Sequence, residues 1–123
     1  LEGKQTAGSR DFLTFREMPW GELYIQPFTG RVLQRAAFSF GTRLEAFRAA
    51  CTAMGGLPLQ AGDAGFEFTL LGNYRLRMLL WAGDDEFPPS AQLLYSANFV
   101  DGFAAEDRVV AGDLLCNEIK ANL

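Results

Sequence analysis

The chain has 123 residues, of which 49% are hydrophobic and 21% charged, and this composition is typical of one globular domain with a sizeable core. Its net charge of −4 at neutral pH argues against nucleic-acid binding, because nucleic-acid binders present a basic face to the phosphates. No run approaches the ~18 apolar residues that cross a membrane, and the polar opening LEGKQTAGSRDF is unlike a signal peptide, so we expect a cytoplasmic protein.

The first third of the chain is predicted to contain two extended segments and a helix. DFLTFREM (11–18) is typical of a short extended segment, and ELYIQPF (22–28) alternates in a way that predicts a strand ended by Pro27. GRVLQRAAFSFG (30–41) carries apolar residues at helical spacing, and Gly41 is expected to end this helix.

A second helix is predicted over residues 43–54. Thr42 and Glu45 have the spacing of a capping box, in which each side chain bonds the other residue's backbone N–H. Gly55 and Gly56 supply the stop. One face of this helix is apolar and comprises Leu44, Phe47, Cys51 and Met54.

The segment GFEFTLLGNYRLRMLLWAGD (65–84) predicts a β-hairpin. Phe66, Phe68 and Leu70 alternate with polar residues, and Gly72-Asn73 suits a two-residue turn that requires positive φ. On the second arm one face is apolar throughout. The opposite face carries arginines first and becomes apolar near its end.

The last third of the chain predicts one further strand and a closing helix. AQLLYSA (91–97) is the strand candidate, and AEDRVVAGDLLCNEIKANL (105–123) is the helix, weakened slightly by Gly112. We therefore expect residues 1–123 to form a single α+β domain, a fragment of a longer domain or protein. Its mostly antiparallel sheet would have three to five strands packed against two or three helices.

The segment LLWAGDDEFPPSAQLLYSANFVDGFAAEDRVVAG (79–112) resembles the signature of a bacterial and archaeal family, domain of unknown function 3786. Its most specific part is EFPPSA (86–91). The stretches FREMPWGELY and MGGLPLQAGDAGFEF lie where that family places similar segments, and the resemblance extends over the family's C-terminal two-thirds.

The resemblance implies a kind of partner protein and a metabolic context, but it does not imply a particular reaction. Members of the family are often joined to a four-cysteine iron–sulfur module in anaerobes, which implies an iron–sulfur protein or module as a partner and a link to redox or corrinoid one-carbon metabolism. No cysteine of this chain matches that module, so no cofactor is expected within it. The chain departs from the family at Tyr95-Ser96, where relatives often have Phe-Asp, and at Ala105, where a capping Thr is common.

Acidic residues give the first candidate site. Asp84, Asp85 and Glu86 could offer oxygen ligands to a divalent cation such as magnesium or calcium. Asp63 could join them from elsewhere in the chain, as could Glu106 or Asp107 if the last helix begins beside this loop. The alternative is structural: the acids cap a turn, or accept hydrogen bonds from unpaired N–H groups of that helix. We favour the structural alternative.

Phe87, Pro88 and Pro89 complete the acidic loop. The prolines fix two φ angles and would hold the loop stiff, while Phe87 is expected to fill the core. The segment 83–90 is therefore predicted to be a rigid connector between two strands.

A second candidate site lies on the arginine face of the hairpin. Arg75 and Arg77 with Trp81 could bind a flat anionic ligand, because guanidinium groups pair with anions and an aromatic ring offers a stacking surface. A solvated strand face is the alternative. Cys51 and Cys116 are expected to be inert buried thiols.

Three functions are compatible with these features. The first is an accessory or ligand-binding domain, which predicts an apolar pocket rimmed by arginine. The second is a carboxylate-based metal enzyme, which predicts three or more converging carboxylates. The third is a structural interaction domain, which predicts an exposed apolar patch or an unpaired strand edge. The absence of histidine removes the commonest general base, so binding is favoured over catalysis, while the oligomeric state is left open.

Overall fold

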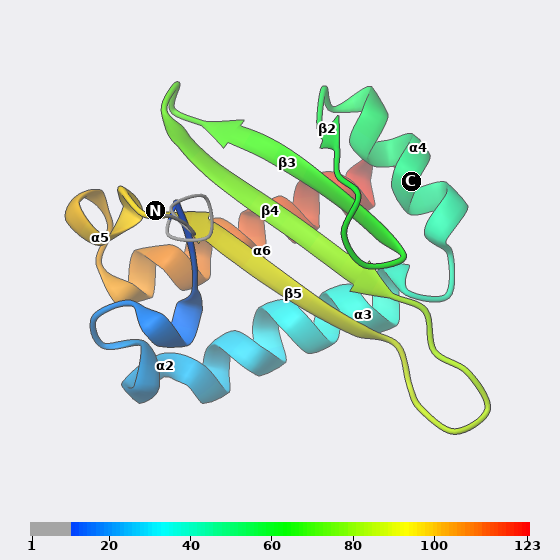
Figure 1. Cartoon of the computed structure of the whole chain (residues 1–123), viewed down its shortest axis with the longest axis horizontal. Coiled ribbons are helices and arrows are strands. Elements are labelled where there is room, and N and C mark those ends of the chain that lie inside the picture. Colours follow the sequence, from blue (N-terminus) through cyan, green and yellow to red (C-terminus); the bar gives the residue numbers. More distant parts are fainter. Residues whose placement is uncertain (1–10) are drawn as a thin grey trace.

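The computed structural model describes residues 11–123. Residues 1–10 lie outside the described part, and they include most of the polar segment that is unlike a signal peptide. The described chain forms a five-stranded sheet in which every neighbouring pair is antiparallel (Figure 1). Its strand order is β1 (Phe12–Thr14), β5 (Ser90–Ser96), β4 (Tyr74–Trp81), β3 (Ala64–Leu70) and β2 (Leu57–Pro58).

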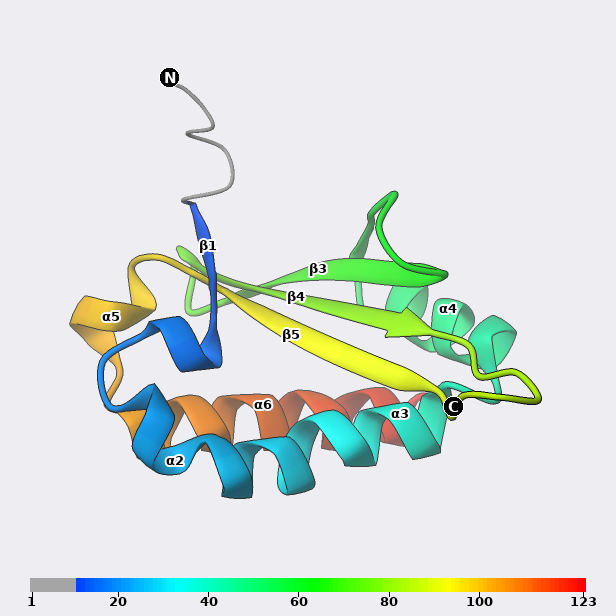
Figure 2. The ribbon, with the colours of Figure 1, turned by 60° about the horizontal axis from the view of Figure 1, so that its bottom comes forward.

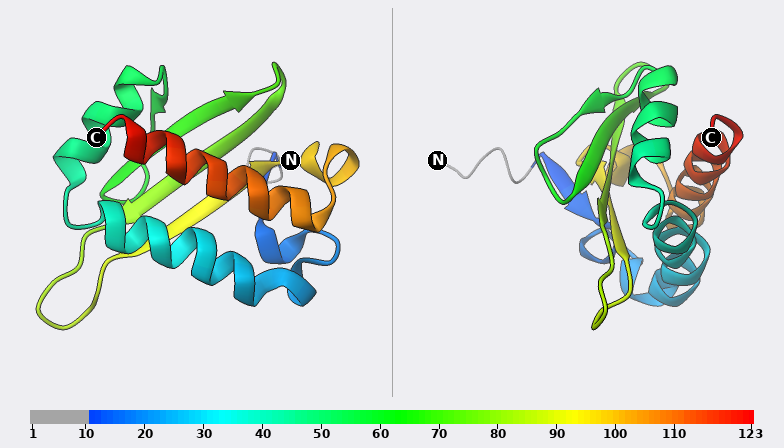
Figure 3. Two further views of the ribbon diagram at one scale, coloured as in Figure 1. Left: turned by 180° about the vertical axis from the view of Figure 1, so that it is seen from behind. Right: turned by 90° about the vertical axis from the view of Figure 1, so that its right-hand side faces the viewer.

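The helices cover one face of this sheet, which confirms the α+β class (Figure 2). α2 (Gly21–Phe28), the π-helical segment η2 (Thr29–Gln34) and α3 (Arg35–Phe40) follow one another as one rod. α6 (Ala105–Ala121) lies beside that rod, and α4 (Leu44–Ala53) covers one end of β3 (Figure 3). Two short elements complete the chain, the 3-10 turn η1 (Phe15–Glu17) and α5 (Phe99–Gly102).

The predicted hairpin is confirmed, and its alternation decides which face is core. Leu76, Met78 and Leu80 of β4 are buried against the helices. Their neighbours Arg75 and Arg77 point to the opposite face, because successive side chains of a strand alternate. The turn differs from the prediction: Leu70 pairs with Tyr74 across three residues, of which Leu71 and Gly72 have positive φ.

The prediction of a strand over residues 22–28 is wrong, because this segment is helix α2. The buried residues Phe28, Val32, Ala36 and Phe40 recur every four positions along the rod, so one helical stripe faces the sheet. The Phe28 ring stacks on Phe15 with centroids 4.2 Å apart. Tertiary packing therefore outweighs the strand-like alternation of apolar and polar residues in this segment. The π-helical segment begins two residues after Pro27, a residue that disrupts the regular hydrogen bonding of an α-helix.

The other helices agree with the sequence except at their caps. α4 ends as predicted, with Gly55 at φ 82° and the Gly56 N–H bonded to the Cys51 carbonyl. The predicted capping box at Thr42 is absent, since Glu45 pairs with Arg48 instead. The last helix and the strand before it are confirmed.

Gly112 contributes close packing as well as a weak helix position. A Cβ added there would lie 3.0 Å from side-chain atoms of both Val32 and Leu93. The glycine therefore lets α6 approach the central helical rod and β5 closely.

Candidate functional site

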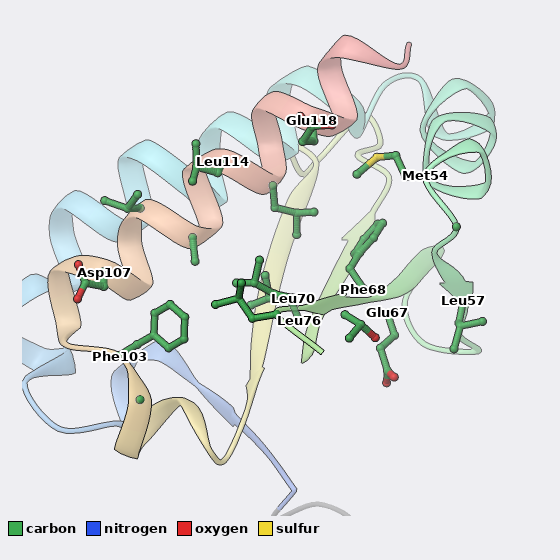
Figure 4. Close-up of a pocket in the computed structure, with 17 residues that line it drawn as sticks. Met54, Leu57, Glu67, Phe68, Leu70, Leu76, Phe103, Asp107, Leu114 and Glu118 are labelled. Atoms are coloured by element: carbon green, nitrogen blue, oxygen red, sulfur yellow. The ribbon is translucent and has the colours of Figure 1, made fainter. Parts of the chain in front are cut away.

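An apolar groove lies between α6 and β3, and we call it the α6–β3 groove (Figure 4). Its volume is about 760 Å³. It is lined by Met54, Gly55, Leu57, Glu67, Phe68, Thr69, Leu70, Leu71, Leu76, Gly102, Phe103, Asp107, Val110, Ala111, Leu114, Leu115 and Glu118.

The groove exists because the helical layer is incomplete over the β3 edge. Phe68 and Leu70 alternate towards the helical face, as the strand period requires. α4 closes only one end of the space above them, where Met54 lies, while Phe103 marks the opposite end (Figure 4). β2 pairs with β3 only at Leu57–Glu67 and Pro58–Phe66, so it extends the sheet by very little.

Large apolar side chains around the groove are exposed. Val110 and Leu114, one turn apart on α6, are 44% and 57% exposed, and Leu57 and Leu71 are more exposed still. A contiguous apolar surface of this kind is unusual on a domain that works alone, and it is typical of an interaction or ligand site.

The charges of the groove are acidic. Asp107 and Glu118 both belong to α6, and no Lys or Arg is among the lining residues. Glu67 is neutralised on the open sheet face by Arg77, whose Nε lies 2.8 Å from Oε1, and by the more distant Arg75. The rim thus carries two carboxylates for which the described residues show no ion pair.

The acidic loop lies elsewhere, between β4 and β5 (Figure 1). Asp84 Oδ1 accepts hydrogen bonds from the N–H groups of Glu86 and Phe87, each 2.8 Å long, and these bonds lower the pKa of the Asp84 carboxyl. Asp85 and Glu86 are exposed. The loop geometry is that of a capped turn.

In this loop Phe87 is exposed to solvent, whereas Pro89 packs against the rest of the fold. Phe87 is 66% exposed, so the expectation that it fills the core is wrong. The Phe87–Pro88 peptide is trans. Pro89 packs on Gly41 at the turn between α3 and α4, where an added Cβ would lie only 2.5 Å from the proline Cβ.

The structure does not bring Glu106 and Asp107 to the acidic loop. The loop precedes the first residue of β5 whereas α6 follows its last, and seven residues of strand span about 20 Å. Glu106 instead accepts a 3.1 Å hydrogen bond from the Tyr24 hydroxyl, which raises the pKa of Tyr24. Within residues 11–123, no group of three or more His, Cys, Asp or Glu side chains is placed to hold a metal ion.

Arg75, Arg77 and Trp81 share a face of β4 but do not form one site. The Arg77 guanidinium stacks over the Phe12 ring at 3.8 Å and pairs with Glu67. Trp81 lies four residues further along the strand, about 13 Å away, with its ring beside Gly62. The arginines are thus occupied by partners within the fold.

The two cysteines are buried, reduced thiols. Burial raises the pKa of Cys51 to about 12 and that of Cys116 to about 11. Thiolates are the reactive form of cysteine, so these side chains serve packing rather than chemistry.

Reasoning from sequence missed the α6–β3 groove and the buried Arg108. The four-residue spacing of Val110 and Leu114 on a predicted helix was a visible signal for an apolar stripe, but a stripe of this kind also marks a core-facing side. Only the position of α4 shows that it stays uncovered.

Comparison with known proteins places this chain in a family. The family model described as domain of unknown function (DUF3786) matches residues 1–118. Neither the curated proteins nor the solved structures include a match to this chain. In the described residues, no helix is long and apolar enough to cross a membrane. The chain belongs to the DUF3786 family.

Proposed function

We propose that this DUF3786 domain is a non-catalytic accessory domain that binds a segment of a partner protein in the α6–β3 groove. One observation carries the proposal: the α6–β3 groove is apolar, open and bordered by exposed leucines and a valine. Such surfaces mark interaction sites.

The charge and the apolar lining of the groove distinguish between the three candidate functions. A pocket for an anionic ligand would be rimmed by arginine, whereas this rim carries carboxylates. A metal enzyme requires converging ligands, and the acids singled out from the sequence lie at opposite ends of β5. The exposed apolar patch is what a protein-interaction domain requires.

We further propose an iron–sulfur protein or module as the partner. The support for this identity is the family resemblance of residues 79–112. A corrinoid as a cofactor and a divalent cation at Asp84, Asp85 and Glu86 both stay predictions.

The test is a selection of binding peptides from a random library. A displayed library of random peptides is selected on the wild-type domain and counter-selected on Leu114→Glu, which places a charge on the exposed wall of the groove. Leu23→Glu is the matched control, because Leu23 is a similarly exposed helical leucine outside the groove.

We expect the selected peptides to bind the wild type and the Leu23→Glu variant alike, and to lose at least tenfold in affinity for Leu114→Glu. Thermal melting of the three proteins verifies that each is folded. If no peptide distinguishes Leu114→Glu from the control, the groove is not a protein-binding site and the proposal is overturned.

A further inference from the structure

We propose that the occupant of the α6–β3 groove is an amphipathic helix that lies along α6 and carries two basic side chains, one for Asp107 and one for Glu118. This inference rests on the proposed function, and it specifies the chemistry of the partner segment. Its basis is the shape of the groove, the placement of its charges and the poor fit of other occupants.

The shape suits a helix. The groove runs beside α6 from Phe103 at one end to Met54 at the other, over a floor made by β3 (Figure 4). α6 and the α2–α3 rod already cover the rest of the sheet, and α4 reaches only one end of the remaining space (Figure 3). A further helix would complete this layer and bury Val110 and Leu114.

The charges set the spacing of the ligand. Asp107 and Glu118 are eleven residues apart on α6, which corresponds to about 16 Å or three helical turns. No cation lines the groove, so both carboxylates are available to a docked segment. Basic residues eleven positions apart on a neighbouring helix would reach both, while apolar residues between them contact Val110 and Leu114.

An added β-strand fits less well. β2 occupies the outer side of β3 at Phe66 and Glu67, and the strand ends at Leu70. A peptide strand would therefore find only the short stretch from Phe68 to Leu70 to pair with, too little for the main-chain hydrogen bonds on which strand addition depends.

A second copy of this chain also fits less well. Pairing α6 against α6 of another copy in antiparallel fashion brings Asp107 of one molecule next to Glu118 of the other. Such like-charge contacts are destabilising. Charge complementarity thus favours a basic partner over self-association.

The test uses a designed 18-residue helical peptide with an apolar stripe at positions i, i+3, i+4 and i+7, and with lysines eleven positions apart. A second peptide has glutamates in place of those two lysines. Fluorescence anisotropy measures the binding of both peptides to the wild type, to Leu114→Glu, and to the double variant Asp107→Lys, Glu118→Lys. Both acidic positions are exposed, so the double variant is expected to fold.

The lysine peptide should bind the wild type more tightly than the glutamate peptide, by about fivefold for two exposed ion pairs, and added salt should reduce the difference. The double variant should reverse the preference. Leu114→Glu should weaken both peptides.

Three results would overturn the inference. The first is equal binding of the two peptides, and the second is a double variant with unchanged preference. The third is a concentration-dependent dimer of the wild type that Leu114→Glu dissociates, because it identifies a second copy as the occupant. If groove-dependent peptides emerge from the library selection but the charge reversal fails, the proposed function stands and only this inference falls.

Discussion

The hydroxyl of Tyr95 donates a 2.7 Å hydrogen bond to the main-chain carbonyl of Arg108, and this buried contact ties the C-terminal end of β5 to the first turn of α6. Tyr95 is fully buried among Phe15, Phe28 and Phe99, so its hydroxyl has no access to water. A buried hydroxyl needs such a partner, because an unsatisfied polar group in the core is costly.

Tyr95→Phe should lower the free energy of unfolding by about 1 to 2 kcal/mol, since it removes the donor and leaves the Arg108 carbonyl without this bond. Urea denaturation measures the change. Tyr74→Phe is the control, because Tyr74 packs on Phe99 and Phe103 but has no described hydrogen bond of its hydroxyl. Equal loss in both variants would show that the Tyr95 hydroxyl contributes nothing specific.

Arg108 itself should be a cost to stability. Its side chain is buried, Nη2 donates to the Pro19 carbonyl, and Nε and Nη1 have no partner among the described residues. Burial lowers the pKa of the guanidinium, as expected for a cation removed from water. We expect Arg108→Met, which keeps the apolar stem, to raise the free energy of unfolding by about 1 kcal/mol.

Arg108→Ala is the matched variant, because it removes the apolar stem as well as the guanidinium, which lies over the Phe15 ring. It should be less stable than Arg108→Met. If Arg108→Met loses stability as Arg108→Ala does, the bond to Pro19 outweighs the desolvation of the guanidinium.

The thiols predict a pH dependence at the alkaline end. Their pKa values in the fold are raised, to about 12 for Cys51 and about 11 for Cys116, above the ordinary value of 9.0. Because the pKa of each thiol is higher in the folded than in the unfolded chain, the thiols of the unfolded chain ionise first as the pH rises. The stability present below the unfolded pKa is therefore lost as the pH rises towards the folded pKa. The free energy of unfolding should therefore fall between about pH 9 and pH 12.

A double Cys51→Ala, Cys116→Ala variant should show a flatter profile over the same range, although it is less stable at neutral pH. At pH 8 a disulfide reagent should modify neither thiol of the native wild type and both thiols after denaturation. Rapid labelling of the native protein would contradict the assignment of both cysteines to the core.

Several elements could be predicted from the sequence because their signals are local. The alternation of Phe66, Phe68 and Leu70 defined β3, and the glycines after Met54 ended α4. The EFPPSA segment indicated the family, which the match over residues 1–118 confirms. These features depend on residues close in the chain, where backbone geometry and side-chain period act directly.

The rest was decided by contacts between distant segments. Residues 22–28 are helical because Phe28 packs on Phe15 and on Tyr95, and Tyr95 is far away in the sequence. Glu86 and Glu106 lie apart because β5 runs between their segments. The α6–β3 groove arises where α4 stops short of covering β3. The sequence by itself determined which residues are apolar and at what period, but burial depends on what packs against each face, and only the tertiary structure decides that.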